Sequence, residues 1–198
     1  MTSKDMKFRK RKSNDLFRSS LFYIYAQRAY IYSIVAVFLF GSVLGFVYSG
    51  ELGFLDKTLA EIFEKTKDLG FLEMVWFIFS NNIASAITSF VLGALLGIFP
   101  IFNAVFNGIL LGYVYSKAVP IAGYFVIWRV LPHGIFELPA IFIALGLGVH
   151  LGASFFGKEK IKTLSKRFRL SFKAFLTVVL PLLVIAAIIE SLLVVFAG

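Results

Sequence analysis

Residues 131–140 read LPHGIFELPA and lie within an apolar run that extends from about residue 123 to residue 148. If the run is helical, His133 and Glu137 are four residues apart and project from one face. An ionisable side chain is costly in hydrocarbon, so such residues usually face a bundle interior or a water-filled cavity. The stretch therefore predicts a membrane helix with a polar face that other helices cover.

Two prolines, Pro132 and Pro139, accompany these ionisable residues. A proline inside a helix removes a backbone hydrogen bond and kinks the helix, and neighbouring groups must then satisfy the freed carbonyl. We therefore expect a kinked helix here, and we expect the rest of the chain to form a bundle around it.

The composition of the whole chain indicates a membrane protein. Of its 198 residues, 59% are hydrophobic and 16% are charged, whereas soluble domains have about 45–50% apolar and about 25% charged residues. Apolar runs of about 20 residues, the length that spans a bilayer, recur along the chain. The predicted fold class is all-α: a polytopic transmembrane helix bundle of about five spans with a short amphipathic interfacial helix.

The elements follow from the hydropathy pattern. A basic cytoplasmic tail, which we expect to be mobile, covers residues 1–20, and a single transmembrane domain covers residues 21–198. The five spans are predicted at residues about 29–48, 73–99, 101–117, 123–151 and 172–197.

Two shorter features lie between the predicted spans. Residues about 54–69 place apolar side chains at helical spacing among charged ones, which predicts an amphipathic helix on the membrane surface; a helix that binds a partner is the alternative. Pro100 and Asn103 predict a tight turn between the second and third spans.

The net charge of +9 is concentrated in two places, residues 1–20 and residues 158–173, and we expect the second to be a loop. Cytoplasmic segments of membrane proteins carry an excess of Lys and Arg, so both clusters, and the N-terminus, are expected inside. Five spans then place the acidic residues 50–70 and the C-terminus outside. Such basic clusters attract anionic lipid headgroups. Because the charge is not spread over a folded surface, we expect no nucleic-acid partner.

Glycines at four-residue spacing predict close contacts between helices, within the chain or in a dimer. The pairs are Gly41/Gly45, Gly93/Gly97, Gly108/Gly112 and Gly148/Gly152.

Polar side chains from three predicted spans lie at overlapping depths in the outer half of the membrane. They are Asn81, Asn82, His133, Glu137 and Glu190. A buried carboxylate must be neutral, paired or hydrated, so we predict that these groups meet. Such a polar cluster either pins kinked helices together or lines an outward-facing cavity for an ion, a proton or a small solute; catalysis is a third alternative.

The sequence offers little for metal or cofactor chemistry. It has no cysteine, which excludes disulfides and thiolate ligands. His133 and Glu137 could ligate one ion, but a zinc site normally needs three protein ligands. Of the further candidates, Glu190 lies at a suitable depth, whereas His150 lies near the inner end of its span and is expected to be a boundary residue. We expect no metal, no cofactor and no enzymatic activity.

The Pro-His-Gly and Glu of residues 131–140 resemble the signature of the stage II sporulation protein M family. Residues about 70–195 agree with it, notably at Asn81-Asn82, Asn107-Gly108 and Ile189-Glu190. The resemblance implies a small multi-pass protein of a bacterial or archaeal cytoplasmic membrane, whose namesake resembles a scaffold that works with peptidoglycan hydrolases. It implies assembly with copies of itself or with membrane protein partners; relatives in organisms that never sporulate imply a transport-like role as the alternative.

Overall fold

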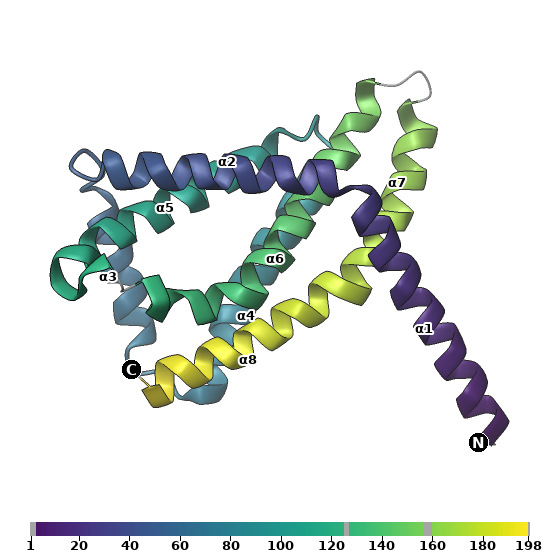
Figure 1. Ribbon diagram of the computed structural model, residues 1–198, viewed down its shortest axis with the longest axis horizontal. Coiled ribbons are helices and arrows are strands. Elements are labelled where there is room, and N and C mark those ends of the chain that lie inside the picture. The colour runs from purple at the N-terminus through teal and green to yellow at the C-terminus, as the bar shows by residue number, and fades with distance from the viewer. Residues whose placement is uncertain (1–2, 125–126, 157–159, 198) are drawn as a thin grey trace.

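The computed structural model describes the backbone of residues 3–124, 127–156 and 160–197, and the side chains of residues 15–121, 123–124, 134–156 and 160–195. All regular structure in these residues is helical, which confirms the predicted fold class. In chain order the elements are α1 (Ser3–Ala26), α2 (Arg28–Val47), α3 (Leu55–Thr66), α4 (Phe71–Leu92), α5 (Ile98–Ala122), α6 (Ile127–Gly152), a 3-10 turn (Ala153–Phe156), α7 (Lys160–Ala174), a π-helical turn (Phe175–Val179) and α8 (Leu180–Ala197), as Figure 1 shows.

Five stretches of the described residues are long and apolar enough to cross a membrane, as predicted. They are Arg28–Val47, Phe71–Leu92, Ile98–Ile121, Gly134–Phe156 and Lys160–Val195. Large apolar side chains on these helices point outward; Leu39, Leu72 and Phe102, for example, are exposed. Such a surface is suited to lipid, because hydrocarbon rather than water would surround it.

The turn between the second and third spans differs from the prediction. The chain turns at residues 93–97, where Leu96 and Gly97 have φ angles of 60° and 73° in the left-handed region. Pro100 lies instead in the first turn of α5, where the missing N–H has no helical partner to lose. The prediction that Pro100 and Asn103 mark the turn was therefore wrong, and the third span is longer than expected.

Both basic segments are helical where they are described, which corrects the expected loop at residues 158–173, whereas the mobility of the tail at residues 1–20 stays a prediction. The tail forms most of α1, and the segment at 158–173 is largely α7, which continues through the π-helical turn into α8. The physical reason in α7 is an apolar stripe at helical spacing, Ile161, Leu164 and Phe168, which runs between the basic residues.

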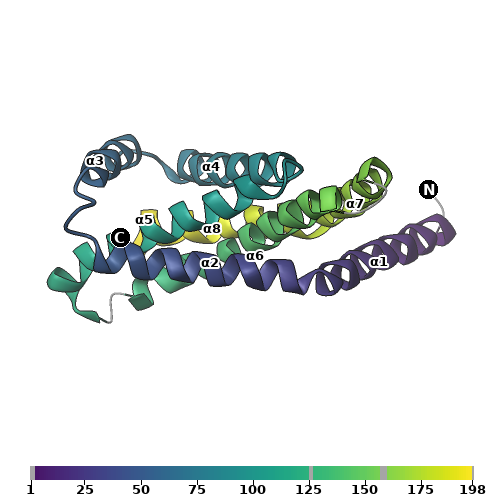
Figure 2. The same cartoon turned by 90° about the horizontal axis from the view of Figure 1, so that it is seen from above.

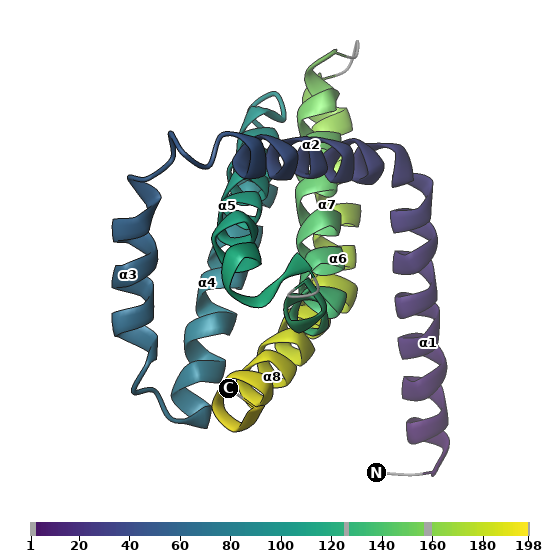
Figure 3. The same ribbon diagram turned by 60° about the vertical axis from the view of Figure 1, so that its left-hand side comes forward.

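The two basic helices lie at one end of the bundle, which we call the basic end, and α3 lies at the other (Figure 2). Contacts tie α1 to α7: the hydroxyls of Tyr23 and Ser171 are 3.0 Å apart, and Lys173 Nζ donates to Ser19 Oγ at 3.4 Å. Seen from the side, α1 and α3 flank the bundle on opposite sides (Figure 3).

The glycine pairs lie at two helix crossings within the chain. At the first, α2 packs in parallel against α5, and a Cβ on Gly41 would lie 2.6 Å from the carbonyl oxygen of Val105. A Cβ on Gly108 would meet the Phe38 carbonyl, and one on Gly112 the Ser42 carbonyl. Only glycine permits helix backbones to approach this closely.

The second crossing joins α6 to α4 and to the turn that follows it. A Cβ on Gly93 would lie 2.5 Å from the Gly148 backbone, and a Cβ on Gly152 would meet the Gly97 nitrogen. Gly97 itself has a positive φ, and a Cβ there would lie 3.2 Å from the Val149 Cα, so its position in the turn is suited to glycine for two independent reasons.

Candidate functional site

The structure brings together two of the predicted polar residues, Glu137 on α6 and Glu190 on α8. Their side chains form a hydrogen bond, and both are only partly exposed. The facing helices carry small residues in the core, such as Ala140 on α6 and Ala186 on α8, which let the two helices pack closely. A carboxylate can only accept hydrogen bonds, so a bond between two carboxyl groups needs a proton on one of them. The Glu137–Glu190 pair therefore meets part of its hydrogen-bonding capacity between two membrane helices.

One carboxyl oxygen of this pair could form a further hydrogen bond. Glu190 Oε2 is buried and has no hydrogen-bond partner among the residues whose side chains are described. His133 lies one turn before Glu137 on α6, and its side chain falls outside the described residues, as does that of Pro132. The donor role of His133 stays a prediction, and so does a kink at Pro132 and Pro139, both of which fall inside α6.

The two predicted asparagines differ in their surroundings. Asn82 is buried at 8% exposure on the face of α4 that also carries Ile78 and Ala86, whereas Asn81 is exposed. The Asn81 amide donates to Asn82 Oδ1 at 3.4 Å. A contact between these amides and the Glu137–Glu190 pair stays a prediction.

A third polar contact, between α4 and α5, was not predicted. Asn103 Nδ2 donates to Ser85 Oγ at 3.0 Å and to Ser89 Oγ at 2.9 Å. Ser85 and Ser89 are four residues apart on α4, so one amide can bridge them. The four-residue spacing of the two serines was visible in the sequence, but nothing there indicated that the Asn103 amide would bind them.

At the α3 end, a polar triad attaches the amphipathic helix to the bundle. The buried Tyr113 donates to Asp56 Oδ1 at 2.6 Å, and Lys117 Nζ lies 3.3 Å from Asp56 Oδ2 and 5.1 Å above the Tyr113 ring. The Tyr113 hydrogen bond, with a smaller contribution from Lys117, holds the pKa of Asp56 below its ordinary value. The helix predicted at residues 54–69 is thus confirmed as α3, and its first turn is tied to α5.

At the basic end, His150 lies near the end of the fourth span, as expected of a boundary residue, and it is also a point of contact between four helices. It is 7% exposed, and its ring centroid lies 6.1 Å from that of Tyr23 on α1 and 5.1 Å from that of Tyr30 on α2. Arg167 on α7 donates from Nη1 to the His150 carbonyl at 2.7 Å. That carbonyl lies in the last turn of α6, where helix carbonyls lack regular partners.

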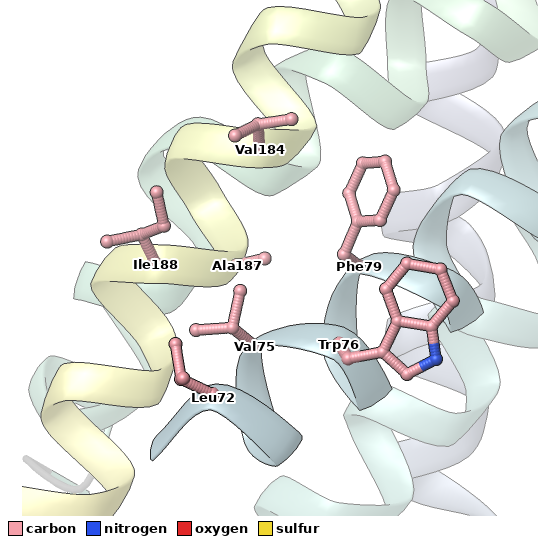
Figure 4. Close-up of a pocket in the computed structure, with 7 residues that line it drawn as sticks. All are labelled: Leu72, Val75, Trp76, Phe79, Val184, Ala187 and Ile188. Carbon is pink, nitrogen blue, oxygen red and sulfur yellow. The ribbon is translucent and has the colours of Figure 1, made fainter.

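Two cavities of different character open at the basic end and between α4 and α8. The larger, of about 450 Å³, lies at the basic end and is lined by Tyr23, His150, Lys162, Thr163, Lys166, Arg167 and Leu170. The smaller, of about 220 Å³, is an apolar groove between α4 and α8 (Figure 4), lined by Leu72, Val75, Trp76, Phe79, Val184, Ala187 and Ile188. The described residues contain no group of three His, Cys, Asp or Glu side chains that could hold a metal ion.

Comparison with known proteins identifies the family. No curated protein and no solved structure matches the chain. The family model of stage II sporulation protein M matches residues 34–194, from within α2 to within α8, and so includes both carboxyl groups of the Glu137–Glu190 pair. With that match and its five membrane-spanning helices, the chain belongs to the stage II sporulation protein M (SpoIIM) family and is an integral membrane protein.

Proposed function

We propose that this protein acts without catalysis, as an assembly protein in the cytoplasmic membrane of a bacterium or archaeon, and that it associates with copies of itself or with other membrane proteins. The observation that carries the proposal is the hydrogen bond between Glu137 and Glu190. These two carboxyl groups contact each other across two packed helices, and neither lines one of the two cavities described above.

The glycine crossings support the same proposal. Two sets of backbones in van der Waals contact, α2 with α5 and α4 with α6, leave little room for one helix to slide past another. A transporter must move one group of helices against another to expose a site alternately. A rigid membrane frame is better suited to holding partners in place.

A second function, coupled transport of a proton or cation, is favoured by one specific observation. The buried Glu190 Oε2 lacks a hydrogen-bond partner among the described side chains and could accept a proton or bind a cation. Intramembrane carboxyl groups often mark ion pathways and proton relays.

Flux measurements on reconstituted vesicles decide between the two functions. The full chain is inserted into liposomes that carry a pH-sensitive dye or a cation-sensitive dye, and an ion gradient is imposed. We expect the same leak as in protein-free liposomes. A flux above that leak, lost in both Glu137→Gln and Glu190→Gln, would overturn the assembly proposal and support transport.

Association is tested separately by crosslinking in the membrane. Because the chain has no cysteine, single cysteines at exposed positions on the spans, such as Leu39, Leu72 and Phe102, report on neighbours without interference. We expect at least one position to crosslink to a second copy or to one recurring membrane protein. A chain that stays uncrosslinked at every position would contradict assembly.

A further inference from the structure

The cavity at the basic end has the chemistry of an anion site. Three of its lining side chains are cations, Lys162, Lys166 and Arg167, and Tyr23 and Thr163 add hydroxyl groups. None of the described residues that line it carries a carboxylate. Cations gathered around a concave surface raise the local concentration of anions.

Arg167 is held in the wall of this cavity by a contact that uses only some of its N–H donors. Arg167 uses Nη1 to hold the His150 carbonyl, and a guanidinium has five N–H donors in all. The Tyr23 hydroxyl is fixed beside Ser171 Oγ at 3.0 Å. The same hydroxyl donates to the Arg167 carbonyl at 3.5 Å, so Tyr23 holds α7 in position and the remaining donors belong to the Arg167 guanidinium.

The cavity also lies where the apolar part of the bundle ends. His150 belongs to the last two turns of the fourth span, whereas the lysines belong to the polar first turns of α7. Ile161, Phe168 and Phe172 on the same helix are exposed. An apolar face beside a basic one is typical of a helix at the level of lipid headgroups.

We propose that the cavity lined by Lys162, Lys166 and Arg167 binds a phosphate ester, and that a phosphate-bearing anionic lipid headgroup is its source in the membrane. Basic cavities between membrane helices on the cytoplasmic side bind lipid headgroups of this kind. A headgroup bound in this cavity would contact α1, α6 and α7 at once. This role does not depend on which partners the spans assemble with.

The test compares two double variants that remove the same charge from the same helix. Lys162→Gln/Lys166→Gln changes the cavity, whereas Lys160→Gln/Arg169→Gln changes exposed residues outside it. Each full-length protein is purified in detergent, and binding of dioleoylphosphatidylglycerol and of zwitterionic dioleoylphosphatidylcholine is measured by native mass spectrometry and by the shift in thermal midpoint. All four substituted residues are exposed, so both variants are expected to fold.

We expect phosphatidylglycerol to bind in preference to phosphatidylcholine. The cavity variant should lose about 25-fold in affinity for it, or roughly fivefold for each of the two cations removed. The Lys160/Arg169 control should bind as the unaltered protein does. Equal losses in both variants, or equal binding of the two lipids, would overturn the proposal.

Competition with inorganic phosphate identifies the source of the anion. If millimolar phosphate does not displace phosphatidylglycerol, the glycerol and acyl chains contribute and the lipid is the ligand. Displacement by phosphate alone, together with a loss of phosphate binding in the cavity variant, would retain the phosphate site but overturn the lipid as its source.

Discussion

Glu137 and Glu190 illustrate what depth alone can predict for single residues. Counting residues from the ends of two apolar runs places both carboxyl groups in the same half of the membrane, and the structure joins them by a hydrogen bond. Hydrocarbon offers no other partner to a buried carboxyl group. Two carboxyl groups at the same depth in the membrane are therefore predicted to lie in contact. The same counting cannot place the His133 imidazole, because the rotation of each helix about its axis also matters.

Substitutions at Glu137 test whether the pair is structural. Glu137→Gln keeps a donor and an acceptor of the same shape, so we expect a thermal midpoint in detergent close to that of the unaltered protein. Glu137→Ala leaves Glu190 buried without this partner and should lower the free energy of unfolding by about 1–3 kcal/mol.

The matched control is the double variant Glu137→Leu/Glu190→Leu. Replacing both partners by apolar side chains removes the unmet hydrogen bond, so stability should return close to that of the unaltered protein. Equal midpoints for the Gln and Ala variants at Glu137 would contradict a buried pair.

Asp56 is a residue whose contact was not predicted. The sequence showed an acidic side chain at the start of an amphipathic helix, and nothing in its spacing indicated Tyr113, 57 positions later. Tyr23, His150 and Arg167 were missed for the same reason: contacts between distant aromatic and basic side chains leave no periodic signal.

The lowered pKa of Asp56 predicts that α3 is released in acid. Because the folded-state pKa lies below the ordinary value of 3.8, the charged form is favoured by folding. This stabilisation is therefore present above that pH and is lost as the pH falls through the folded-state pKa. Spin labels at Glu61→Cys on α3 and Val114→Cys on α5 should give a narrow distance distribution at pH 7, which broadens as the pH falls from 3.8 through the lower folded-state pKa of Asp56.

Asp56→Asn should broaden the same distribution at pH 7, since the amide cannot pair with Lys117 as an anion does. Asp68→Asn, which removes an equal charge from an exposed position, is the control and should leave the distribution narrow. A narrow distribution in Asp56→Asn would show that apolar contacts such as that of the buried Leu55 hold α3 without the triad.

At the scale of elements, the α2–α5 crossing predicts a large effect from one methyl group. Gly112→Ala places a Cβ against the Ser42 carbonyl, which is backbone and cannot move aside cheaply. We expect unfolding in denaturant to become easier by about 1–3 kcal/mol. Gly53→Ala, which adds a methyl group in open space, should change stability by no more than about 0.5 kcal/mol. Similar values for both variants would mean that the crossing relaxes freely.

The elements themselves were predicted unevenly. Spans were found because about 20 apolar residues leave few alternatives. Pro100 misled because proline favours both a turn and the first turn of a helix. The α7 segment was taken for a loop because its lysines and arginines dominate the composition, although Leu164 and Phe168 repeat at helical spacing between them. The charge pattern predicts the side of the membrane, which stays a prediction, and it carries no information on secondary structure.

The whole molecule has two chemically distinct ends, and this constrains its orientation. Contacts between Tyr23 and Ser171 bring both basic helices to one end, while α3 lies at the other. Both clusters must therefore lie on the same side of the membrane, and the excess of Lys and Arg predicts the cytoplasmic side. The N-terminus would then be inside and the C-terminus, at the far end of α8, outside.

Labelling of single cysteines in intact cells tests this orientation. Glu61→Cys on α3 and Ser165→Cys on α7 are exposed positions at opposite ends, and the cysteine-free chain gives no background. A maleimide that cannot cross membranes should label Glu61→Cys in intact cells, and Ser165→Cys only after the cells are permeabilised. The reverse pattern would mean that the protein has the opposite orientation in the membrane, with the cavity lined by Lys162 and Lys166 on the outer surface. That cavity would then face a different set of headgroups, so the orientation also decides which leaflet can supply its ligand.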